Sequence, residues 1–157
     1  MYQLEVKRYL IENMFHPRDG WEVIIDIDAM ERAKGNQQKQ DKKERVIIAE
    51  NAIVEAGVSI GAHPIYGRVD VVAIHPDFGT HLIEVEGKSS KQKEQALCSA
   101  LGQTILMMGK PESNLTYAIA VPDQKHWEFQ MRKIPNNIKS ILNIKCFLVS
   151  KYKVREV

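Results

Sequence analysis

Apolar residues recur with helical spacing near the start of the chain. Val6, Leu10 and Met14 lie four residues apart with Ile11 beside them, which predicts an amphipathic helix over residues 3–15. Further along, short apolar runs alternate with helical patterns. The predicted elements are a strand at 21–28, a helix from Arg45 that Gly57 ends, strands at 69–74 and 81–86, a helix at 91–109, a strand at 115–121, helical turns around Trp127 and Ile141, and strands at 146–149 and 152–154.

This order predicts an α/β protein with a mixed central β-sheet flanked by helices. The run at 115–121 is continuously apolar, as in strands that are buried on both faces. The length suits one domain spanning residues 1–157.

Residues 29–45 lack apolar periodicity and are rich in Lys and Gln, which predicts a mobile loop or an exposed helix extension. The plainer interpretation is a solvent-exposed segment. In the alternative, the segment closes over DNA and Lys39, Lys42, Lys43 and Arg45 contact phosphates.

Three carboxylates interrupt the two neighbouring strands. Asp70 lies in the first, Glu84 and Glu86 lie in the second, and Lys88 follows two residues later. Carboxylates are unusual in central strands unless they are paired, bind metal or face water. Side chains alternate along a strand, so Glu84, Glu86 and Lys88 share one face, and hairpin pairing brings Asp70 near the two glutamates. Converging carboxylates suit a hard divalent cation, Mg²⁺ or Mn²⁺, which prefers oxygen ligands.

The arrangement of these residues resembles the PD-(D/E)XK nuclease superfamily. Asp70 is followed, after a hairpin, by Glu84-Val85-Glu86 or by Glu86-Gly87-Lys88, and Gly67-Arg68-Val69 precedes it as in that superfamily. The resemblance covers residues 67–121 and implies a restriction-endonuclease-like αβββαβ core. It also implies metal-dependent hydrolysis of DNA in which Asp70 and Glu84 hold the cation.

The chain departs from the superfamily pattern at the lysine position. If Glu84 is the metal ligand, Glu86 stands where the lysine usually lies; if Glu86 is the ligand, Lys88 completes the motif. The first register is favoured because Ile83-Glu84-Val85 is typical of the middle of a strand. Glu86 or Lys88 would then position or deprotonate the attacking water.

The resemblance also implies supporting residues on two helices. Gln103 lies on the face of its helix that Ala96 and Ala100 share, where we expect it to approach Glu84. Glu5 would be an outer metal ligand, or else an acidic residue that the dipole favours at a helix start.

Basic and imidazole side chains near the motif are candidates for phosphate contact. They are Arg68, His63, Lys91 and Lys93. Net charge is only +2, but residues 125–157 hold eight basic groups against two acidic ones, which leaves −4 in the rest of the chain. A basic segment beside an acidic half suits a metal and a polyanion.

The two cysteines, Cys98 and Cys146, are far apart and lack a CxxC pair, so we expect both to be buried apolar residues rather than zinc ligands or a disulfide. No apolar run is long enough to span a bilayer and no signal peptide is evident, so a cytoplasmic location without membrane contact is expected.

The sequence therefore favours a Mg²⁺- or Mn²⁺-dependent endonuclease acting on DNA. A homodimer would let two sites cut two strands. The alternative is a catalytically inactive nucleic-acid-binding or protein-interaction domain on the same fold. A small-molecule phosphohydrolase is disfavoured because no glycine-rich phosphate loop is present.

Overall fold

The structure is a computed structural model that describes residues 1–32, 40–88, 92–109 and 114–157. Its helices are α1 (Gln3–Met14), the 3-10 turn η1 (Pro17–Asp19), α2 (Gln40–Glu55), α3 (Lys93–Met107), α4 (Lys125–Met131) and α5 (Asn136–Ile141). Its strands are β1 (Glu22–Ile25), β2 (Ser59–Ile60), β3 (Val71–His75), β4 (Gly79–Val85), β5 (Leu115–Pro122), β6 (Ile144–Val149) and β7 (Val154–Glu156).

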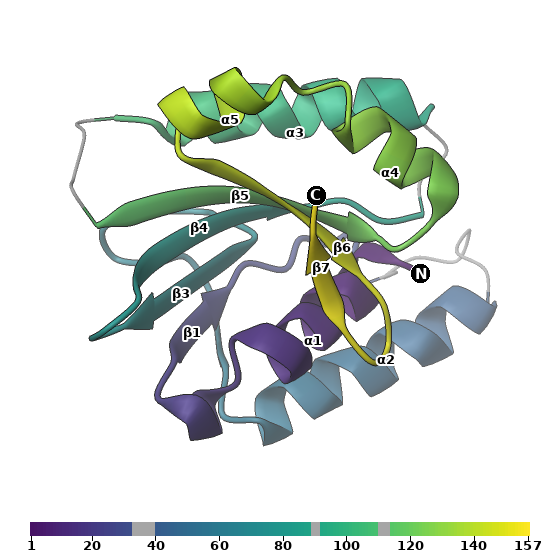
Figure 1. The fold of residues 1–157 in the computed structure, drawn as a ribbon. Coiled ribbons are helices and arrows are strands. Elements are labelled where there is room, and N and C mark those ends of the chain that lie inside the picture. Colours follow the sequence, from purple (N-terminus) through teal and green to yellow (C-terminus); the bar gives the residue numbers. More distant parts are fainter. Residues whose placement is uncertain (33–39, 89–91, 110–113) are drawn as a thin grey trace.

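The seven strands of the described residues form one mixed sheet in the order β2-β1-β3-β4-β5-β6-β7. Strand β3 runs antiparallel to both of its neighbours, β1 and β4. Strand β5 runs parallel to both of its neighbours, β4 and β6. Helices α1 and α2 cover one face, and α3, α4 and α5 cover the other (Figure 1). The predicted α/β class, with a mixed sheet flanked by helices, is confirmed.

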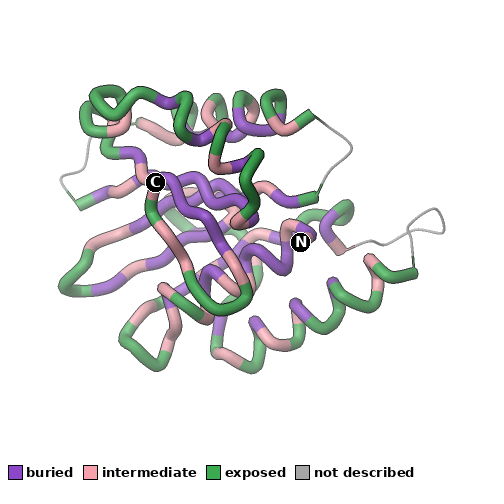
Figure 2. The backbone as a smooth tube through the Cα atoms, turned by 45° about the vertical axis from the view of Figure 1, so that its right-hand side comes forward, coloured by how far each residue is buried: buried purple, intermediate pink, exposed green. Residues whose placement is uncertain are grey.

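Alternation along the strands divides the core between the two faces. Ile83 and Val85 of β4 pack with α1, and Leu82 belongs to the cluster on the opposite face. Strand β5 is buried on both sides, as its apolar run predicts, because Ala118 faces α1 and Ile119 faces α3. Figure 2 shows buried residues along the central strands and on the inward sides of the helices.

Several element boundaries differ from the prediction. Of the two structures predicted for residues 29–45, the exposed helix extension is confirmed for 40–45, which form the start of α2, so this helix begins before Arg45; Lys39 lies outside the described residues. The two-residue strand β2 was not predicted, since two residues carry no periodic signal. Cys146 is buried as expected, but Cys98 is exposed, so that prediction is wrong for Cys98. Within the described residues, no helix combines the length and apolar character needed to cross a bilayer.

Candidate functional site

Asp70 and Glu84 meet where β3 begins and β4 ends. The antiparallel register pairs Val71 with Ile83, so the next positions outward, 70 and 84, are opposite each other. The backbone N–H of Val85 donates to Oδ2 of Asp70 at 2.8 Å. This hydrogen bond fixes the Asp70 carboxylate against β4, beside Glu84.

Burial holds Glu84 in its protonated form. The residue is only 8% exposed, and its carboxyl group shares a hydrogen bond with that of Asp70. Burial first, and then the negative charge of Asp70, raise the pKa of Glu84 to about 8, whereas Lys7 acts in the opposite direction. Glu84 therefore keeps its proton near neutral pH, beside the carboxylate of Asp70.

Lys7 brings a buried positive charge to this pair from helix α1. The side chain is fully buried, and its Nζ lies 2.7 Å from Oδ1 of Asp70 and 2.8 Å from Oε1 of Glu31. It also donates to the backbone oxygen of Asp26 at 2.6 Å. Three oxygens thus accept from one ammonium group, so Lys7 is held rigidly between the sheet and the segment after β1.

Glu31 is the second acid on Lys7. The pKa of Glu31 is raised to about 7, because burial, the largest effect, and the negative charge of Asp70 together outweigh the positive charge of Lys7, which lowers it. Its other oxygen, Oε2, is buried without a hydrogen-bond partner among the described residues. The Lys7 network therefore retains an unsatisfied oxygen in the protein interior.

The start of α1 lies directly over the end of β4. Nε2 of Gln3 is 3.3 Å from Oδ2 of Asp70, and the backbone N–H of Lys88 donates to the oxygen of Met1 at 2.8 Å. A Cβ atom at position 87 would lie 2.7 Å from Cα of Gln3, which is closer than real Cβ contacts. Glycine at 87 therefore permits the approach that carries Gln3 to Asp70.

The predicted outer ligand Glu5 has other partners. Arg45 donates to both Glu5 oxygens, at 2.7 and 2.9 Å, and the backbone N–H of Tyr2 donates at 2.7 Å. Glu5 thus caps α1 and pairs with α2 in this arrangement. Glu86 is half-buried at the end of β4, and Lys88 is exposed with its Nζ over the Tyr2 ring.

Gln103 does not face the sheet as expected. Its side chain is exposed, whereas Ala96, Leu97, Ala100 and Thr104 are buried against the strands. Because Leu97 lies on the buried side, the inward face of α3 is centred away from Gln103. The expected orientation of Gln103 toward Glu84 is therefore wrong.

His63 has a structural contact in its own loop. The ring is buried, and its Nδ1 accepts from the backbone N–H groups of Ile65 and Tyr66 at 3.1 and 3.2 Å. The ring also stacks on Tyr66 with centroids 4.8 Å apart. These contacts shape the segment that leads to Arg68.

Two of the other predicted phosphate contacts, Arg68 and Lys93, have partners within the protein. Arg68 is exposed, and its Nε lies 3.0 Å from Oδ2 of Asp26. Nζ of Lys93 lies over the Trp127 ring, 5.2 Å from its centroid. Lys91 lies outside the described residues.

The donors at Asp70 and Glu84 fit a hard divalent cation in kind. A cation bound between the two groups would replace the proton that Glu84 now holds. Asp70 and Glu84 supply two carboxyl groups. Over the described ranges, no cluster of three or more His, Cys, Asp or Glu side chains is arranged to hold a metal ion.

Lys7, Glu31 and Gln3 were missed by the sequence interpretation. For Lys7 a signal existed, because it lies three residues after Leu4 and four before Ile11, on the apolar face of α1. A charged residue in the buried stripe of a helix needs a partner in the core. Glu31 follows a short strand without any pattern that would point to Lys7.

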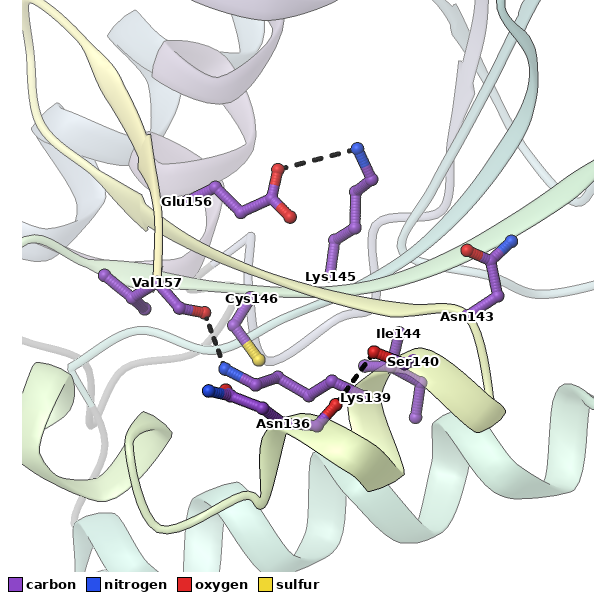
Figure 3. Close-up of a pocket in the computed structure, with 9 residues that line it drawn as sticks. All are labelled: Asn136, Lys139, Ser140, Asn143, Ile144, Lys145, Cys146, Glu156 and Val157. Atoms are coloured by element: carbon purple, nitrogen blue, oxygen red, sulfur yellow. Dashed lines mark hydrogen bonds and ion pairs between the residues drawn. The ribbon is translucent and has the colours of Figure 1, made fainter.

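A separate polar pocket lies between α5, β6 and β7 (Figure 3). It has a volume of about 380 Å³, and none of the predicted site residues lines it. Lys139 donates to the backbone oxygen of Val157 at 3.0 Å, and Lys145 pairs with Glu156 at 3.5 Å. Burial raises the pKa of the Cys146 thiol to about 11, so Cys146 is not an activated nucleophile.

No protein-family model, curated protein or solved structure matches this chain.

Proposed function

We propose that the chain is a Mg²⁺- or Mn²⁺-dependent nuclease that hydrolyses phosphodiester bonds of DNA. The observation that carries the proposal is the meeting of Asp70 and Glu84 at the end of β4, where the half-buried Asp70 carboxylate lies beside the buried, protonated carboxyl group of Glu84. Their position matches the site that the resemblance to PD-(D/E)XK nucleases implies.

The order of elements supports the same proposal. Helix α1 precedes three antiparallel strands, β1, β3 and β4, and helix α3 then leads to β5, which is parallel to β4. This is the order expected of a restriction-endonuclease-like αβββαβ core, with α2 and β2 inserted between the first two of those strands.

Each side chain has a role in this proposal. Mg²⁺ or Mn²⁺ bound by Asp70 and Glu84 would supply positive charge to the phosphate and lower the pKa of a water molecule. Lys7 and the Val85 N–H orient Asp70, and Glu84 must release its proton to bind the cation. Glu86, or Lys88 in the alternative register, orients or deprotonates the attacking water.

The second candidate is a catalytically inactive nucleic-acid-binding domain on the same fold. One observation favours it: the Lys7 ammonium already supplies a positive charge to Asp70 and Glu31 from inside the protein. If Lys7 stays protonated and paired with these carboxylates, they need no metal ion.

Cleavage assays separate the two candidates. Supercoiled plasmid and labelled single-stranded and duplex DNA are incubated with Mg²⁺ or Mn²⁺, using the wild type and the variants Asp70→Asn and Glu84→Gln. We expect both variants to lose cleavage by about 10³-fold or more while DNA binding is retained. Glu55→Gln, on the exposed side of α2, is the matched control.

A wild-type protein that cuts no DNA or RNA with either metal, but binds nucleic acid, would establish the second candidate instead. Cleavage that survives Asp70→Asn and Glu84→Gln would contradict the assignment of the site.

A further inference from the structure

Three cationic side chains gather around one aromatic ring at the start of α1. The Tyr2 ring centroid lies 5.0 Å from Cζ of Arg45, 5.6 Å from Nζ of Lys88 and 6.0 Å from Nζ of Lys42. Lys42 and Arg45 come from the first turns of α2, whereas Lys88 follows β4. We call these four residues the Tyr2 surface.

We propose that the Tyr2 surface binds the phosphodiester backbone of DNA beside the bond that is cut. This inference rests on the proposed function for the identity of the polyanion. The negative face of the ring attracts each cation, but the three positive charges repel one another. A phosphate bound among them would relieve that repulsion.

The contacts of the Tyr2 surface hold it in place. Glu5 pairs with Arg45, the Tyr2 hydroxyl donates to Oδ2 of Asp41 at 2.9 Å, and Lys42 donates to the backbone oxygen of Met30 at 2.9 Å. The Arg45 side chain nevertheless remains 43% exposed. The cations are therefore positioned in advance and still accessible to an anion.

The Tyr2 surface adjoins the Asp70–Glu84 pair. Gln3, the next residue after Tyr2, reaches Asp70, and Lys88 is four residues beyond Glu84 on the same segment. In Figure 1 the start of α1, the start of α2 and the end of β4 lie on the side of the molecule that carries the N-terminus. A DNA strand with one phosphate at the carboxylates would place neighbouring phosphates over the Tyr2 surface.

A cavity extends this edge beyond Arg45. It has a volume of about 300 Å³ and passes from Arg45 and Glu5 to Gln124 and Lys151, which follow β5 and β6. Ligands of α/β sheets commonly bind at the carboxyl ends of parallel strands. A DNA strand bound at the Tyr2 surface would extend into this cavity. The site therefore suits a polymer better than a single phosphate.

The test measures DNA binding without cleavage. Fluorescence anisotropy of a labelled duplex is followed in EDTA over a series of KCl concentrations, for the wild type, Lys42→Gln and Lys88→Gln. We expect each variant to bind about fivefold more weakly at low salt, and the slope of log K against log [KCl] to fall in magnitude by about one.

Lys133→Gln is the matched control. Nζ of Lys133 also lies over an aromatic ring, 5.1 Å from the Phe129 centroid, but it follows α4 on the other face of the sheet. The Lys133→Gln variant should bind the duplex with the affinity and salt dependence of the wild type.

The outcomes separate this inference from the nuclease proposal. If the wild type binds and cuts DNA, and both variants bind as Lys133→Gln does, the Tyr2 surface is wrong and the nuclease stands. If the variants lose affinity and salt dependence but the wild type never cuts, the surface stands and the nuclease fails. If Lys88→Gln lowers the cleavage rate at saturating DNA without changing affinity, Lys88 acts in the reaction and not in this surface.

Discussion

The two ends of the β3–β4 hairpin are built from different chemistry. At the open end, Asp70 and Glu84 lie with Lys7 and Glu31 in a buried charged network. At the turn end, Trp21 packs against His75 and His81, with ring centroids 5.0 and 5.5 Å away.

The difference between the two ends indicates which end of the hairpin carries the functional site. Aromatic rings stabilise the turn end by ordinary packing. Buried charges cost more to desolvate than they return in stability, and well-packed apolar groups often replace them without loss. The open end therefore carries groups that folding alone does not require, which is the expectation for a functional site.

The largest effect is expected at Lys7. Lys7→Met leaves the carboxylates of Asp70 and Glu31 buried without their cation, so urea unfolding should show a loss of about 3–5 kcal/mol in stability. Adding Glu31→Leu to Lys7→Met should recover part of this loss because it removes one stranded charge. A loss below about 1 kcal/mol for Lys7→Met would contradict the claim that Lys7 is the cation that Asp70 and Glu31 require in the folded protein.

The pH dependence of stability should come next. The folded pKa of Glu84, about 8, exceeds the usual unfolded value, so the folded state holds a proton that the unfolded state loses first. The contribution of Glu84 is complete below the unfolded pKa and declines as pH rises through the folded pKa, by about 1.4 kcal/mol per pH unit at most.

Urea titrations from pH 5 to pH 9 in EDTA measure this decline. Glu84→Gln should flatten the profile and be more stable than the wild type at pH 9. Parallel profiles for the two proteins would show that Glu84 has an ordinary pKa.

A smaller effect is expected where α1 crosses β4. Gly87→Ala would force its Cβ against the Gln3 backbone, so we expect a loss of about 1–3 kcal/mol and weaker cleavage. Gly102→Ala is the control, because nothing lies within 4 Å of its Cβ in the middle of α3. That change should stabilise the protein by about 0.5–1 kcal/mol; equal effects at both glycines would contradict the close approach at residue 87.

The smallest effect is expected at the aromatic end. Nδ1 of His81 is buried without a hydrogen-bond partner in the described part of the chain, and burial lowers the pKa of the ring. His81→Leu replaces it with an apolar side chain of similar size, so stability should change by less than about 1 kcal/mol and cleavage should be unchanged. A loss of cleavage would extend the functional region to the turn end.

Local patterns predicted the part of the site that depends on strand geometry. Period-two alternation and a short turn were enough to bring position 70 to position 84. Contacts between distant segments were not predictable in this way, since Lys7 meets Glu31 and Asp70 only after α1 has packed on the sheet.

Helix phase explains the error at Gln103. The small residues Ala96 and Ala100 indicated one inward face, but Leu97 and Thr104 are buried too and turn that face away from Gln103. For Glu5, the alternative of an acidic residue at a helix start is confirmed. Its pairing with Arg45 was not predictable, because Arg45 is forty residues away and lies on another helix.

Calorimetric titration with Mn²⁺ at pH 7 tests the central claim most directly. If Asp70 and Glu84 bind the cation, binding should release about one proton, detected as heat that varies with the ionisation enthalpy of the buffer. Asp70→Asn and Glu84→Gln should each abolish this binding. Absence of binding by the wild type, or binding that both variants retain, would contradict the claim that these two carboxylates form a metal site.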